Sequence, residues 1–75
     1  MSKLPVLSAK KIIKVLKKKG YTLDRVHGSH HVFIRDSDQK SASVPVHQGR
    51  DLGRGITRAI LSDAGISIEE FLKLL

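Results

Sequence analysis

The chain has 75 residues and no cysteine, which is enough for one domain over residues 1–75 and excludes disulfides, thiolate catalysis and a cysteine-based zinc site. Lys and Arg outnumber Asp and Glu by 14 to 7, and the resulting net charge of +7 favours an anionic partner: nucleic acid, an acidic protein or a membrane surface. The sequence after Met1 lacks a secretory signal pattern, and no apolar stretch approaches the ~20 residues of a membrane span. We therefore expect a soluble cytoplasmic protein without membrane contact.

The first predicted element is a helix that begins at Ala9, with Ser8 as its N-cap. Gly20 is placed to end it as the residue after the C-cap. A solvated surface is the ordinary reason for lysines on such a helix, and contact with RNA phosphates is the alternative. One helical face carries Ala9, Ile12, Ile13 and Leu16, and the other faces carry Lys10, Lys11, Lys14, Lys17, Lys18 and Lys19.

Three strands are predicted next. Residues 21–23 and 32–34 are rich in strand-forming residues, and Gly28-Ser29 between them indicates a turn or a bulge. Residues 36–40 form a polar hairpin loop, and residues 41–46 alternate as a half-buried strand does. Pro45 cannot donate to a neighbouring strand, so this third strand lies at an edge or ends there.

Two helices complete the predicted chain. One runs from about Leu52 to Ala64, where Gly65 stops it, and a shorter one starts at Ile68. The apolar stripe of the longer helix comprises Gly53, Ile56, Thr57, Ile60, Leu61 and Ala64, and Arg54 and Arg58 lie on another side. Ser67 and Glu70 form a capping box for the last helix, with Ile66 and Phe71 spaced as its hydrophobic staple. The order α-β-β-β-α-α predicts a two-layer α+β fold, with helices on one face of a three-stranded antiparallel sheet.

Four histidines, His27, His30, His31 and His47, are the main candidates for chemistry. An imidazole exchanges a proton near neutral pH, and RNA supplies its own nucleophile, the 2′-hydroxyl. A histidine metal site is disfavoured because no carboxylate accompanies the histidines at close spacing, so no metal or cofactor is expected. The simplest alternative is that these surface histidines have no catalytic role. Gly28-Ser29 is either an ordinary turn or a turn that binds a phosphate through its backbone and the Ser29 hydroxyl.

The face on which His30 lies is open from the sequence. If Phe33 points to the core, His31 does so too and His30 lies on the exposed face. If Val32 and Ile34 are the core pair, His30 shares their side. In both cases we expect His47 roughly across from His30.

The chain resembles the HicA family of toxin–antitoxin ribonucleases over nearly its whole length. The resemblance rests on several short motifs in one order and spacing: the lysine-rich helix ending in Lys19-Gly20-Tyr21, then Gly28-Ser29-His30 followed by Phe33, Val44-Pro45-Val46-His47, Gly55-Ile56-Thr57-Arg58, Ala64-Gly65-Ile66-Ser67 and Glu70-Phe71-Leu72. His31, which doubles the histidine of the second motif, is a departure from the family pattern.

The resemblance implies a fold of the double-stranded RNA-binding type, which has the same α-β-β-β-α order, and cleavage of mRNA that blocks translation. It implies His30 as the catalytic residue, and a HicB-type antitoxin as the partner. Around His30 we expect Ser29 and Gly28 to hold the phosphate and His47 to assist. A non-catalytic RNA-binding module and a protein that binds only an acidic partner are the rival hypotheses. Candidate contacts to the RNA backbone are Lys10, Lys14, Lys17, Arg25, Arg54 and Arg58.

Overall fold

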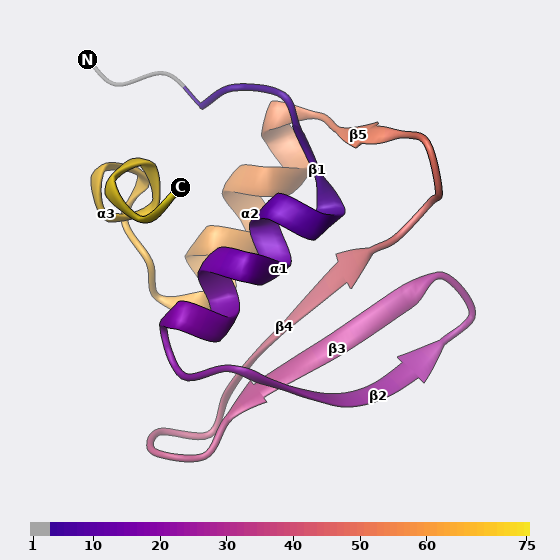
Figure 1. The fold of residues 1–75 in the computed structure, drawn as a ribbon. Helices are drawn as coiled ribbons and strands as arrows, with labels where there is room; N and C mark the ends of the chain where they lie inside the picture. Colours follow the sequence, from indigo (N-terminus) through magenta and orange to yellow (C-terminus); the bar gives the residue numbers. More distant parts are fainter. Residues whose placement is uncertain (1–3) are drawn as a thin grey trace.

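A computed structural model describes residues 4–75 and shows the predicted α+β architecture (Figure 1). Three helices and a three-stranded antiparallel sheet follow in the order α-β-β-β-α-α, and a short pair of strands is added to them. The elements are β1 (Leu7–Ser8), α1 (Ala9–Lys18), β2 (Thr22–His27), β3 (His30–Arg35), β4 (Lys40–Pro45), β5 (Asp51–Leu52), α2 (Arg54–Ala64) and α3 (Ile68–Leu74).

Helix α1 begins and ends where the sequence predicts. The Ser8 hydroxyl accepts a hydrogen bond from the Lys11 backbone N–H at 3.4 Å, which satisfies one of the free donors of the first turn. Gly20 follows the helix with a φ of 89°, a conformation that costs glycine little. The next N–H, that of Tyr21, donates to the Leu16 carbonyl at 3.0 Å and closes the helix end.

Helix α2 starts two residues later than predicted. Leu52 is not helical, because it pairs with Leu7 in the ladder between β1 and β5. Gly53 is the N-cap instead, and Ile56 is 48% exposed, so neither belongs to the buried stripe. Gly65, with a φ of 70°, ends the helix as predicted. The buried residues of α2 are Thr57, Ile60, Leu61 and Ala64.

Helix α3 has the predicted cap in part. The Ser67 hydroxyl accepts from the Glu70 N–H at 3.1 Å, and Ile66 and Phe71 are both buried, as a hydrophobic staple requires. The Glu70 carboxylate, however, accepts from Lys19 Nζ at 2.6 Å. This ion pair connects the end of α1 to the start of α3.

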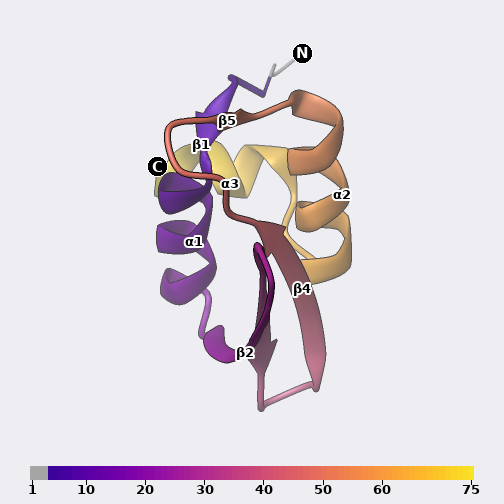
Figure 2. The same cartoon turned by 90° about the vertical axis from the view of Figure 1, so that its right-hand side faces the viewer.

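The sheet has the strand order β2-β3-β4, and its coverage by the helices is uneven (Figure 2). Helix α2 packs against β4, whereas every residue of β2 is exposed. The ladder of β2 shifts register between Leu23 and Arg25, which marks a bulge. Strand β2 therefore extends beyond the helical layer, and both of its faces are accessible.

Tyr21 was predicted to start the first strand, but it precedes β2 and is 1% exposed in the core. Its hydroxyl donates to the Ala64 carbonyl at 2.7 Å, near the end of α2. The Arg35 guanidinium lies 4.8 Å from the centre of its ring, and burial raises the pKa of the Tyr21 hydroxyl. The core is otherwise mostly aliphatic, with Phe33 and Phe71 as its other large aromatic side chains.

Candidate active site

The Gly28-Ser29 segment is a two-residue turn that joins β2 to β3. His27 and His30 flank it and are direct partners in the antiparallel ladder. Gly28 has a φ of 58°, which hairpin turns of this length require at their first central position. The Val46 N–H donates to the Ser29 carbonyl at 2.6 Å, which ties the turn to the chain after β4. The sequence prediction of a turn is confirmed, and the turn holds His30 at the first position of β3.

The alternation of β3 decides the face of each histidine. Phe33 is 2% exposed and lies opposite the buried Ala42, so its side of the sheet faces the helices. His31 is on that side, partly buried, with its Nδ1 buried and lacking a hydrogen-bond partner in the described part of the chain. His30 is exposed and lies on the opposite side, called the open face below. The alternative in which Phe33 points to the core is therefore correct.

The open face at the turn also carries His27 and Arg25. The Arg25 Nε–H donates to Nε2 of His27 at 3.1 Å, and its Nη1 pairs with the Asp24 carboxylate at 2.6 Å. Arg25 lies opposite Val32 in the ladder. Val32 is two residues after His30 in β3, so Val32, His30 and Arg25 are on the same face. All three basic side chains are exposed, so a bound RNA strand can reach them.

His47 does not lie directly opposite His30. The partner of His30 in β4 is Pro45, the last residue of that strand and two residues before His47. His47 follows in the loop of residues 46–50 and lines an open hollow of about 410 Å³ with Lys10 and Arg50, between this loop and the start of α1. The structure thus places His47 next to the basic helix and two residues beyond the direct partner of His30, which fixes the register that the sequence leaves open.

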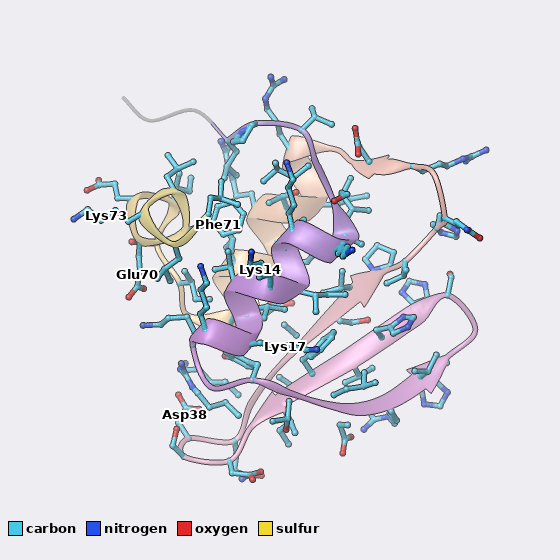
Figure 3. The ribbon with its side chains drawn as sticks, viewed as in Figure 1. Lys14, Lys17, Asp38, Glu70, Phe71 and Lys73 are labelled. Carbon is cyan, nitrogen blue, oxygen red and sulfur yellow. The ribbon has the colours of Figure 1, made fainter. Side chains whose placement is uncertain are left out.

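The candidate RNA-binding residues fall on three surfaces. Lys10, Lys14 and Lys17 are exposed on α1, where Figure 3 labels the last two. Arg25 lies on the open face of the sheet, and Arg58 is exposed on α2. Arg54 has a structural contact, since its Nε–H donates to the Leu4 carbonyl at 2.6 Å and so holds the segment before β1.

The contact between Arg25 and His27 was missed in the sequence. From the sequence, His27 is one of four histidines that are candidates for chemistry and Arg25 is a contact to the RNA backbone, and no link between the two is predicted. The signal that was available is the spacing: residues 25 and 27 lie on one face of a strand, and the two-residue turn makes that the face of His30.

Among residues 4–75, no three His, Cys, Asp or Glu side chains lie close enough together to hold a metal ion. None of the helices in this range has the length and apolar character needed to cross a membrane.

The described elements define a small, basic α+β protein with the element order of the double-stranded RNA-binding fold. Residues 9–66 match the family model described as HicA toxin of bacterial toxin-antitoxin, which covers more than half of the chain. The chain therefore belongs to the HicA toxin family and is a toxin of a toxin–antitoxin system. No curated protein gives a significant match to it.

Proposed function

We propose that this toxin is an endoribonuclease that cleaves mRNA, and so blocks translation, with His30 as its catalytic residue. The observation that carries this proposal is the position of His30: an exposed imidazole at the first residue of β3, fixed by a two-residue turn, in a HicA-family chain of net charge +7. An imidazole placed in this way can exchange a proton with a bound substrate near neutral pH.

The reaction needs no nucleophile from the protein. The RNA 2′-hydroxyl attacks the adjacent phosphorus, and a histidine either takes the proton of that hydroxyl or protonates the leaving oxygen. The turn beside His30 suits a phosphate, because Gly28 has no side chain and no atom beyond its chain neighbours lies within 4 Å of the place a Cβ would occupy. The Ser29 hydroxyl and the nearby backbone are proposed to hold that phosphate. No metal takes part in this scheme.

The basic side chains supply the affinity for RNA. Contacts to phosphates are sequence-independent and release counterions, so exposed Lys and Arg suffice for them. Lys10, Lys14, Lys17, Arg25 and Arg58 are proposed to bind the RNA backbone, whereas Arg54 contributes charge while its Nε is engaged by Leu4. His47, in the hollow with Lys10, is proposed as a second proton carrier or as an orienting group.

The partner of this toxin is proposed to be a HicB-type antitoxin that covers the active site, and the place of action is the cytoplasm, where mRNA is translated. Membership of the HicA family supports both statements. The excess of positive charge supports an anionic substrate and favours an acidic antitoxin surface.

Induced expression of the chain in a bacterial host, with and without a co-expressed antitoxin, tests the proposal. We expect growth arrest without the antitoxin, and we expect His30→Ala to relieve it. His31→Ala is the matched control, because it removes the neighbouring imidazole from the opposite face. If both variants remain toxic at equal protein levels, histidine catalysis at this turn is wrong; if only His31→Ala relieves the arrest, the catalytic histidine is misassigned by one residue.

A further inference from the structure

The turn that positions His30 also positions a second histidine on the same face. His27 and His30 are direct partners in the antiparallel ladder, and such partners have their Cβ atoms about 4.5–5.5 Å apart. Both side chains are exposed. His31, although adjacent in sequence, lies on the helix-facing side and cannot reach the same bound phosphate. The open face therefore offers two imidazoles to one site.

The His27 ring contacts Arg25, its neighbour on the same face of β2. The Nε–H of Arg25 donates to Nε2 of His27 at 3.1 Å, so the guanidinium reaches this ring. Arg25 is itself paired with Asp24. In β4, the positions on the open face opposite His30 and Val32 are Pro45 and Ser43, which are uncharged. On the open face of this hairpin the ionisable neighbours of His27 are Arg25 and His30, with Asp24 paired to Arg25, and His47 follows two residues after Pro45.

We propose that His27 is the general base that works with His30 as the general acid, and that Arg25 binds the scissile phosphate of a single-stranded RNA. This proposal rests on the endoribonuclease function proposed above. An imidazole directly beside His30 suits the task of accepting a proton, and a guanidinium within reach of the same ring suits the phosphate oxygens.

The step is balanced without water or a metal. His27 takes the proton of the 2′-hydroxyl, the 2′-oxygen forms a bond to phosphorus, and the bond from phosphorus to the 5′-oxygen breaks. Protonated His30 gives its proton to that leaving oxygen. The products are a 2′,3′-cyclic phosphate and a 5′-hydroxyl end, and proton exchange with solvent restores both rings. Arg25 moves from His27 to the non-bridging phosphate oxygens, whose charge grows in the transition state.

The experiment is single-turnover cleavage of a short end-labelled RNA by the purified chain over a range of pH, with identification of the cleaved ends. We expect His27→Ala and His27→Asn each to slow cleavage by about 10²–10⁴-fold, which is the usual effect of losing a positioned acid or base. The Asn side chain still offers an acceptor to Arg25 but cannot act as a base. Equal losses of rate in the two variants therefore mean that His27 transfers a proton and does not merely position Arg25. His31→Ala is the control, with an expected effect below about tenfold.

The pH profile provides the readout that a structural role would not change. The wild-type profile is expected to be bell-shaped, and the rising limb at low pH, which reports a base that must lose its proton, is expected to disappear in the His27 variants. Cleavage by His27→Ala at the wild-type rate with both limbs intact would overturn the assignment of His27 alone. A wild-type chain that binds RNA without cleaving it would overturn the proposed function, and the assignment with it.

Discussion

The lysine stripe of α1 allows a quantitative prediction for RNA binding. Lys10, Lys14 and Lys17 are spaced i, i+4 and i+7, so they lie on one side of the helix, and all three are exposed. Replacing them together by Gln removes three charges without touching the buried face of α1, so the fold is expected to survive. Each phosphate contact to single-stranded RNA contributes about 0.7 to the slope of log affinity against log salt, so the slope should fall by about 2.

The assay is binding of a fluorescent RNA from 50 to 200 mM salt, in a His30→Ala background that prevents cleavage. A slope change of about 2 over this fourfold range means that the wild-type chain loses about 15–20-fold more affinity than the lysine variant. The control replaces Lys40 and Lys73 by Gln, which removes charge from β4 and α3 instead. An unchanged slope in the α1 variant would refute the reasoning and move the RNA-binding surface elsewhere, first to Arg58.

Three further predictions concern stability and metal dependence. Tyr21→Phe should lower the free energy of unfolding by about 1–3 kcal/mol, measured in urea, because the buried Ala64 carbonyl loses its donor; an unchanged midpoint would contradict this. The Arg35 guanidinium lowers the pKa of Asp38 from 3.8 to about 2, so the stability from this pair is present above pH 3.8 and is lost as the pH falls toward 2. Asp38→Asn should remove that part of the acid sensitivity in urea titrations, and an identical pH dependence would count against the pair. Cleavage of RNA should survive excess chelator; loss of activity that a divalent ion restores would require a metal.

The helix ends could be predicted from the sequence because local chemistry decides them. Ser8, Gly20, Gly65 and Ser67 act through hydrogen bonds and backbone angles within one turn of the helix. The same argument explains the turn at Gly28. The start of α2 was misplaced because Leu52 is held by β1, a contact about 45 residues away in sequence that no local pattern reveals.

The strands were predicted too short for a related reason. Residues 24–27 and 30–31 lack the apolar alternation of a half-buried strand, because β2 is exposed throughout and only Phe33 of β3 is buried. Pairing with the neighbouring strand keeps these residues extended, and pairing depends on the whole hairpin.

The sequence predicts which residues form the candidate site, but not on which face of the sheet they lie or which of them are in contact. The run Val32-Phe33-Ile34 is apolar on both faces, so the side of His30 could be decided only when Phe33 was found against Ala42. Arg25 and His27 share the open face because they are two residues apart in β2, whereas the bulge before Arg25 changes only how the earlier residues of β2 pair with β3.

The most direct test of the account is cleavage of a defined RNA by the purified chain in the presence of EDTA, with wild type, His30→Ala and His31→Ala compared at equal concentration and with matching circular dichroism spectra. If His30 is the catalytic residue, wild type and His31→Ala cleave the RNA, and His30→Ala loses about 10²–10⁴-fold in rate with RNA binding retained. Equal cleavage rates for wild type and His30→Ala would contradict the central claim that His30 carries the chemistry.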